Sequence, residues 1–325
     1  SMLFVATSCG NSWLDLEPST SVDTETSIKI LSDVEFTLNG IYSTMQSSDA
    51  YSGRLVYYGD VTGDDMQAVS STKRVANYYR FNFTKDDNPS SHWSYLYSII
   101  QNCNLILMNI DKLVIDEDDK AYRDDLKGEA LAIRGLALFD LTRIFGYPYL
   151  KDDGASLGVP IIEGLSTIDS KPTRNTVAQC YTKIIDDLTQ SLSLLGEKFN
   201  KGKINKWGAM VLLSRVYLYK GENANALKMA SDAIIGAEKN KYALWTNEDY
   251  PTAWGEDASA SKPGEVLFEI VNLTTDSPGK ESMGYLNSYD GYDDMCITCS
   301  FYQFLKEDPK DIRLKLLSFD KKYYC

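Results

Sequence analysis

Apolar residues recur at intervals of three and four along several long stretches of the chain, and this spacing places them on one face of an α-helix. The clearest stretch runs from Leu31 to Met45 and ends before two serines. Three further stretches keep the same spacing, over residues 93–113, 118–145 and 177–195. Thr176 precedes the last of them and is a favourable N-cap residue. We therefore predict four long amphipathic helices.

Residues 206–236 carry the most specific architectural pattern. Ser214 is followed three residues later by Tyr217, and Gly221 marks a turn. Small residues recur beyond this turn, at Ala226, Ala230 and Ala233. Small side chains let a second helix lie close against the first, as in the helix pair of a tetratricopeptide repeat. The predicted fold class is mainly α, a tetratricopeptide-like scaffold of helix pairs with long irregular loops and a few short strands.

Two regions lack this helical spacing. Residues 49–92 are rich in Tyr, Gly, Asp and Ser, and we predict a long loop inserted into a helical core that spans residues 27–236. Residues 237–325 are predicted to form a mixed loop and strand segment that carries ligand contacts. Within it we expect a strand over residues 265–272 and a short helix from Phe301 to Leu305.

Composition and charge exclude one class of partner. The chain has 46 acidic and 33 basic side chains and a net charge of −13, which would repel a phosphate backbone, so nucleic acid is not an expected partner. No apolar run approaches the roughly 18 residues needed to span a bilayer as a helix. The 22 tyrosines and 5 tryptophans supply more amphipathic aromatic surface than a helical core needs, so we expect some of these rings to face a ligand.

Two of the irregular segments combine aromatic rings with polar side chains, the mixture that a carbohydrate site requires. The flat apolar face of an aromatic ring stacks against the C–H side of a sugar, and a few polar groups fix its hydroxyls. In the first segment the candidate ligand-binding residues are Asp65, Arg74, Asn77, Tyr78 and Tyr79. In the second they are Tyr285, Tyr289, Asp290 and Tyr292. Each of these tyrosines could instead serve in loop packing.

Enzymatic chemistry finds little support in the sequence. His92 is the single histidine, which removes histidine-based metal triads and leaves one candidate base of that type. A pair of carboxylates for glycoside hydrolysis could be chosen among the acidic residues, but their abundance makes the choice uninformative. Cys296 and Cys299 form one CxxC pair without a second pair or a nearby histidine. We therefore predict no catalytic residues, no metal and no cofactor.

The N-terminus resembles the end of a bacterial lipoprotein signal. Residues 3–8 read LFVATS and precede Cys9, which would carry the lipid. Ala6 stands where such signals usually have Leu. We interpret residues 1–8 as the remnant of the signal and residues 9–26 as a polar tether that would hold the protein at a membrane surface.

Several motifs together resemble the SusD/RagB family of Bacteroidetes. A WLDLEP segment follows Cys9, and the helix from Trp93 to Asn104 is similar to a Trp-x-x-x-Tyr-x-x-Ile-x-x-x-Asn element of the family. The most characteristic stretch is 127–150, matched at Glu129, Ala130, Arg134, Gly135, Phe139, Phe145, Gly146 and Pro148. Residues 158–162, the helix pair, the expected strand and the EDPKDIR at 307–313 follow in the order of the family.

This resemblance implies a fold and a function. The fold would contain four tetratricopeptide-like helix pairs, with the ligand site on irregular loops. The protein would be a lipid-anchored protein of the outer membrane at the cell surface, which captures a glycan for a SusC-like TonB-dependent transporter. A peptide ligand is the alternative, because the RagB branch of the family is associated with peptides. Family members commonly continue well beyond the 307–313 element, so we expect a further C-terminal part to be missing here.

Overall fold

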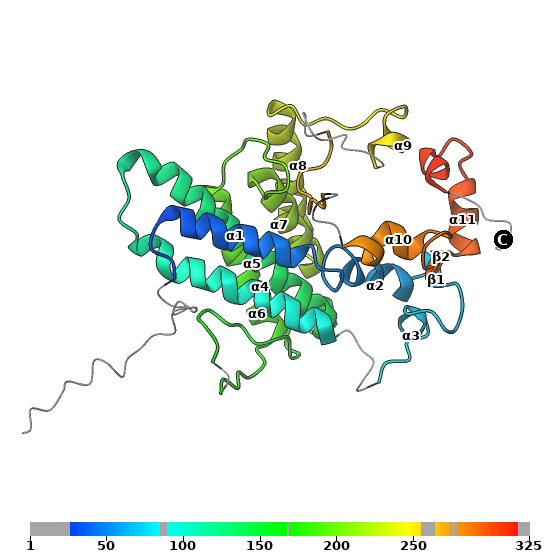
Figure 1. The fold of residues 1–325 in the computed structure, drawn as a ribbon, viewed down its shortest axis with the longest axis horizontal. Helices are drawn as coiled ribbons and strands as arrows, with labels where there is room; N and C mark the ends of the chain where they lie inside the picture. The colour runs from blue at the N-terminus through cyan, green and yellow to red at the C-terminus, as the bar shows by residue number, and fades with distance from the viewer. Residues whose placement is uncertain are drawn as a thin grey trace, which may run out of the picture.

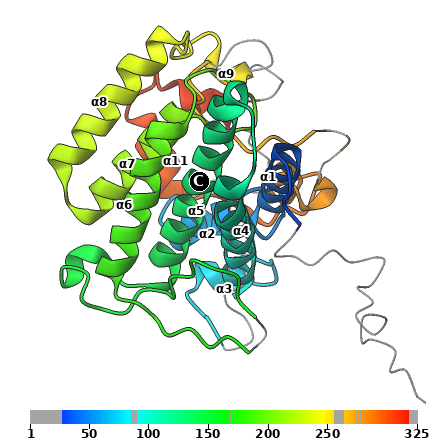
Figure 2. The same ribbon diagram turned by 90° about the vertical axis from the view of Figure 1, so that its left-hand side faces the viewer.

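The computed structural model describes residues 27–84, 90–167, 169–254, 264–273, 275 and 278–317. Cys9 and the tether predicted at 9–26 lie outside these residues. Six long helices lie side by side and form the body of the described part (Figures 1 and 2). They are α1 (Leu31–Met45), α4 (Ser90–Asn109), α5 (Lys120–Phe145), α6 (Val177–Leu194), α7 (Lys206–Lys220) and α8 (Asn223–Lys239).

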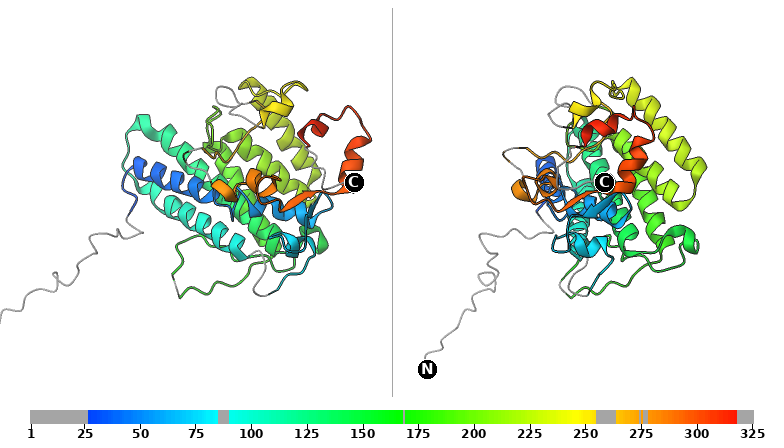
Figure 3. Two further views of the ribbon diagram at one scale, coloured as in Figure 1. Left: turned by 45° about the vertical axis from the view of Figure 1, so that its right-hand side comes forward. Right: turned by 90° about the vertical axis from the view of Figure 1, so that its right-hand side faces the viewer.

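Short elements gather mostly beyond one end of this body (Figures 1 and 3). The short α-helices are α2 (Arg54–Thr62), α3 (Ala76–Tyr79), α9 (Tyr250–Ala253), α10 (Met283–Asn287) and α11 (Cys299–Lys306). Two strands, β1 (Met66–Ala68) and β2 (Met295–Ile297), pair antiparallel. Short 3₁₀-helices span Ile110–Lys112, Glu117–Asp119, Tyr149–Lys151, Gly279–Glu281 and η7 (Ile312–Leu316).

Helix α5 is the centre of the body and contacts α1, α4, α6 and α7. Nearly every residue from Leu126 to Thr142 is buried, on all sides of the helix. A helix that is covered all round belongs to the interior, so the other helices pack about it. The largest apolar cluster combines its side chains with those of the neighbouring helices, including Leu38, Leu96, Phe139, Ile184 and Leu213.

A buried charge pair fixes α5 against α6 and α4. The Arg134 guanidinium donates two hydrogen bonds, 2.8 and 2.7 Å long, to the carboxylate of Asp187 on α6. It donates a third, 2.8 Å long, to the Oδ1 of Asn104 on α4. The amide of Asn104 in turn donates to the backbone oxygens of Ile162 and Gly164. The arginine of the family-like stretch is therefore a structural residue that joins three helices to the 158–167 segment.

A second buried polar contact joins α1 to α5. The Tyr42 hydroxyl donates to Glu129 Oε2 at 2.6 Å and accepts the backbone N–H of Ile204 at 3.1 Å. The side chain of Glu129 is 3% exposed, and burial raises its pKa from 4.5 to about 7, although the Tyr42 hydrogen bond and the charge of Lys203 act in the opposite direction.

The predicted helices are confirmed. Thr176 caps α6 with its Oγ1, which accepts the N–H of Gln179, while the Gln179 side chain accepts the N–H of Thr176. Gly221 ends α7 with φ +83°, a backbone conformation that favours glycine. The Ser214 hydroxyl donates to the carbonyl of Ala226, which holds α7 and α8 together as the helix pair that the small residues predicted. The short helix expected at Phe301 is α11.

Two predictions were wrong. The region 49–92 is not a continuous loop, because it contains α2, β1 and α3, and α4 begins at Ser90. These elements are too short for a helical period to show in the sequence. Residues 265–272 do not form a strand. Phe268 and Ile270 pack on the main apolar cluster instead, so the apolar run meets helices rather than a partner strand.

Candidate functional site

The strand pair brings the two predicted ligand-binding segments together. Met66, Gln67 and Ala68 of β1 lie opposite Ile297, Cys296 and Met295 of β2. The pairing continues at both ends, because the N–H of Val69 bonds the oxygen of Asp294, and the N–H of Thr298 bonds the oxygen of Asp65. Segments more than 200 residues apart in the chain therefore form one surface.

Arg74 joins the two segments a second time through its side chain. Its Nε lies 3.0 Å from Asp294 Oδ2, and its Nη1 lies 2.9 Å from Glu281 Oε2. The guanidinium carbon lies 4.1 Å from the centre of the Tyr292 ring, a cation–π contact. The neighbouring Lys73 Nζ donates to the backbone oxygen of Tyr292 at 2.5 Å. Arg74 thus holds the second segment in place through its Nε and Nη1 donors.

The second segment folds into a tight turn that presents aromatic rings. The N–H of Tyr292 bonds the oxygen of Tyr285 in α10 at 3.0 Å, and the N–H of Asp294 bonds the oxygen of Leu286 at 2.9 Å. The rings of Tyr285 and Tyr292 meet edge to face at 5.2 Å. Tyr289 lies at the tip of the turn with 57% of its surface exposed. The turn therefore carries one exposed ring, Tyr289, beside the Tyr285 and Tyr292 rings that pack on each other.

The predicted residues of the first segment differ in exposure, because some lie at the surface and Tyr78 is buried beneath it. Tyr79 and Asp65 are exposed, and Asn77 is partly buried. Tyr78 is 7% exposed and belongs to a small apolar cluster beneath the surface, so it supports the site from below. The other buried members of this cluster are Tyr57, Val61, Val75, Leu286 and Met295. Asp290 is exposed beside Tyr289.

Two further aromatic rings of the first segment, Phe81 and Phe83, are exposed and were not among the predicted residues. Phe81 is 64% exposed and has φ +53°, an unusual backbone conformation for a bulky residue. Phe83 packs against Tyr58 and Tyr78, with ring centres 6.3 and 5.8 Å away. The aromatic run YYRFNF at 78–83 was the signal that could have identified them. We refer to the exposed and partly exposed rings of the two segments together as the aromatic surface; they are Tyr79, Phe81, Phe83, Tyr285, Tyr289 and Tyr292.

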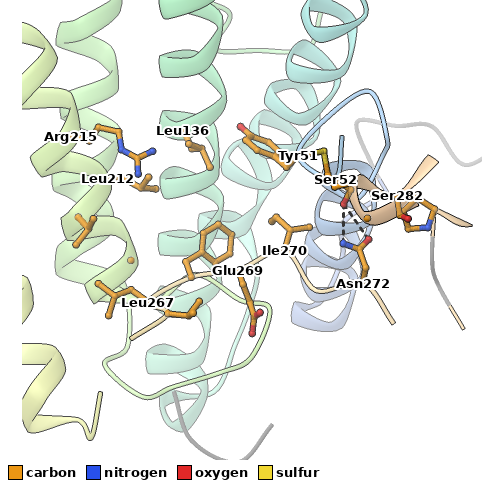
Figure 4. A pocket seen from close by; sticks show the side chains of 17 residues that line it. Tyr51, Ser52, Leu136, Leu212, Arg215, Leu267, Glu269, Ile270, Asn272 and Ser282 are labelled. Atoms are coloured by element: carbon orange, nitrogen blue, oxygen red, sulfur yellow. Dashed lines mark hydrogen bonds between the residues drawn. The ribbon is translucent and has the colours of Figure 1, made fainter. Parts of the chain in front are cut away.

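A pocket of about 750 Å³ adjoins this region at α10 (Figure 4). Ser282, Met283 and Gly284 on its rim directly precede Tyr285. Arg215 and Leu212 of α7 lie on one side, and Ser52 and Asn272, which are hydrogen-bonded to each other, lie on the other. Most of the remaining lining is apolar, including Leu136, Val211, Val266, Leu267, Phe268 and Ile270. The stretch that was predicted as a strand therefore forms a wall of this pocket.

His92 is buried and does not face a ligand at the surface. Its Nδ1 lies 3.1 Å from the oxygen of Asp49, and its ring packs against Tyr58. Burial lowers its pKa, which favours the neutral imidazole. Within the described ranges there is no group of three or more His, Cys, Asp or Glu side chains that could hold a metal ion. None of the helices in these ranges is long and apolar enough to cross a membrane.

Comparison with known proteins identifies the family. Residues 12–218 match the model of a SusD-like family described as "Starch-binding associating with outer membrane". The chain belongs to the SusD-like family. This family is carbohydrate-binding and associated with the outer membrane.

SusD-like relatives resemble the chain in sequence and in fold. SusD-like protein P2 of Formosa agariphila is 27% identical over 300 residues, which are 89% of this chain and 55% of the relative. The crystal structure of a putative sugar binding protein from Bacteroides vulgatus is 82% identical, with a TM-score of 0.90, over 92% of this chain and 67% of that one. A laminarin binding SusD-like protein shares the fold, with a TM-score of 0.70 and 19% identity, over 87% of this chain and 66% of that one. The chain thus spans about half the length of SusD-like protein P2 and about two thirds of these solved structures.

Proposed function

We propose that this SusD-like chain captures a neutral glycan on the aromatic surface and releases it unchanged to a SusC-like TonB-dependent transporter. Lipid attached to Cys9 would anchor the protein to the outer membrane at the cell surface. The family's association with carbohydrate and with the outer membrane supports the proposal. The −13 charge of the chain favours a neutral ligand over an anionic one.

The observation that carries this proposal is the exposed Tyr289 ring on a braced turn. A turn held by Arg74, Lys73 and β2 keeps its shape when a ligand binds, so little conformational entropy is lost. The exposed phenol offers a flat face to the C–H side of a sugar. Asp290 and Asp65 supply carboxylates on the same surface that can accept hydrogen bonds from sugar hydroxyls.

Replacing Tyr289 with alanine tests the site. We expect Tyr289→Ala to weaken glycan binding roughly threefold to tenfold, because one stacking ring is lost. Its melting temperature should stay within about 1 °C of wild type, because the exposed ring supports no core packing. Calorimetric titration with laminarin and soluble starch measures the affinity. The matched control is Phe36→Ala, an exposed ring on α1 in the helical body. Equal affinities of Tyr289→Ala and Phe36→Ala would remove the turn from the site.

The absence of catalysis is tested on the same mixtures. Chromatography of laminarin and starch after long incubation with the protein should show no shorter products. Released oligosaccharides would contradict the proposal that the glycan leaves unchanged.

Anchoring and transport make a separate prediction. In the native host, Cys9→Ser should move the protein from the outer-membrane fraction to the soluble fraction, because the lipid has no attachment site. Affinity purification of the wild-type protein from detergent-solubilised membranes should retain a TonB-dependent transporter. Retention of the variant in the membrane fraction would contradict the lipid anchor, and purification without a transporter would contradict the partner.

A peptide is the second candidate ligand, and the pocket at α10 favours it. Its walls are mostly apolar, and Arg215 and Glu269 are the charged residues of its lining. Such a lining suits apolar side chains with a few charged groups better than sugar hydroxyls. Titration with a mixture of peptides distinguishes the two ligands. Binding of peptides without binding of laminarin or starch would favour the peptide.

A further inference from the structure

A second group of aromatic rings lies away from the aromatic surface, in the segment that follows α8. Trp245, Tyr250 and Trp254 contact one another in pairs, with ring centres 5.0 to 6.2 Å apart. Each pair meets edge to face, with interplanar angles of 68° to 83°. None of the three belongs to the apolar clusters of the described part of the chain. We call these residues the tryptophan group.

Trp254 is the exposed member of the tryptophan group. It keeps 57% of its surface exposed, whereas Trp245 and Tyr250 are partly buried against it. The exposed indole offers a broad, flat apolar face on which a ligand can stack.

The backbone around the tryptophan group is held in place. The N–H of Trp245 donates to Glu265 Oε2 at 3.0 Å, and the N–H of Ala243 donates to the oxygen of Gly264 at 2.9 Å. Gly264 has φ +56°, and a Cβ there would lie 2.5 Å from the Trp245 indole nitrogen. Only glycine allows this close approach. The rings are therefore ordered before a ligand arrives, which lowers the entropic cost of stacking.

The surroundings of the tryptophan group suit hydroxyl groups and disfavour anions. Asp249 accepts a hydrogen bond from the Thr246 hydroxyl at 2.8 Å, and Glu265 accepts one from the backbone N–H of Trp245. Arg313 of η7, which contacts α9, is paired with Asp311. Carboxylates can accept hydrogen bonds from sugar hydroxyls, and they repel sulfated or uronic sugars. The chemistry of the group therefore matches a neutral sugar.

The position of the tryptophan group allows one polymer to reach both sets of rings. Helix α9 lies at the same end of the molecule as α10, α11 and the strand pair, beyond the end of α1 and α4 (Figures 1 and 3). A short oligosaccharide would occupy one set of rings. A long chain that leaves the aromatic surface could contact the other set as well, and two linked contacts bind more tightly than one.

We propose that Trp245, Tyr250 and Trp254 form a second sugar-stacking subsite, which adds affinity for long neutral polysaccharides. This inference rests on the proposed function, because it takes the aromatic surface as the first subsite. The prediction is specific to chain length. Removing the indole should weaken the binding of a polymer and leave the binding of a trisaccharide unchanged.

The test compares four variants of the full chain, Trp254→Ala, Trp254→Phe, Tyr289→Ala and the control Phe36→Ala. Each is titrated with laminarin, soluble starch, laminaritriose and maltotriose. We expect Trp254→Ala to bind the polymer that wild type prefers roughly threefold to tenfold more weakly and to bind its trisaccharide as wild type does. Tyr289→Ala should bind both more weakly. Trp254→Phe should retain most of the polymer affinity, because a ring remains.

Tryptophan fluorescence keeps the test decisive if Trp254→Ala folds poorly. Addition of the polymer should change the emission of the wild-type protein, and Trp254→Phe should lose most of that change while it melts at the wild-type temperature. Polymer affinity of Trp254→Ala equal to that of Phe36→Ala would overturn the second subsite and leave the proposed function intact. A wild-type chain that binds peptides and neither polymer would overturn both.

Discussion

Glu129 shows how a single buried carboxyl group links stability to pH. Burial raises its pKa to about 7, while in the unfolded chain the ordinary value of 4.5 applies. Between these values the folded protein binds a proton that the unfolded chain does not. The contribution of Glu129 to stability is therefore complete below pH 4.5 and is lost as the pH rises through about 7.

This linkage predicts the effect of Glu129→Gln, an uncharged replacement of similar shape. At acid pH the variant should be about as stable as wild type, because both side chains are neutral. Above pH 7 it should be more stable by up to roughly 3 kcal/mol. Urea denaturation at a series of pH values measures the free energy of unfolding. A difference between the two proteins that does not change with pH would contradict the raised pKa.

Tyr42 provides an independent check on the same group. Its hydroxyl donates to Glu129 and lowers the pKa of that carboxyl, so Tyr42→Phe should move the loss of stability to higher pH. Because Ile204 also loses its hydrogen-bond acceptor, the variant should be less stable than wild type at every pH.

At the scale of elements, the contacts of Arg134 decide how α4, α5 and α6 are held together. Arg134→Ala would leave Asp187 buried beside Lys183 alone, and Asn104 would lose the donor to its Oδ1. We expect a loss of about 3 to 5 kcal/mol in the free energy of unfolding, the usual cost of breaking a buried ion pair from one side. Arg80→Ala is the control, because Arg80 is exposed. Similar denaturation midpoints for the two variants would show that the buried pair contributes little.

The long helices could be predicted because each buries one continuous stripe, and the stripe repeats in the sequence over several turns. Thr176 predicted where α6 begins and Gly221 predicted where α7 ends, because an N-cap hydrogen bond and a positive φ depend only on the local backbone. Residues 265–272 had the composition of a strand, but a strand needs a partner elsewhere in the chain. Here α5 and α7 cover that stretch, and no periodicity within it could reveal this.

At the scale of the whole molecule, the candidate site depends on contacts that no local pattern contains. Tyr289 and Tyr292 could be named from the sequence as candidate ring residues, because the loop combines aromatic and polar side chains. That Arg74 would brace this loop could not be predicted, since Arg74 and Asp294 lie 220 residues apart in the chain. The pocket at α10 could not be predicted for the same reason, because five separate segments form its walls.

The pairing of β1 with β2 also bears on the order in which the protein folds. Neighbouring helices of the body can associate as soon as each pair has formed, because they are close in sequence. The two short strands must close a loop of more than 200 residues before they gain three paired positions, so they should meet only after the body has brought them near. The strand pair has three paired positions and its apolar cluster is much smaller than that of the helical body, so this end should open more readily than the body does. Its amide protons should exchange with solvent faster than those of α5, and the ligand-binding surface should be the last part to form and the first to loosen.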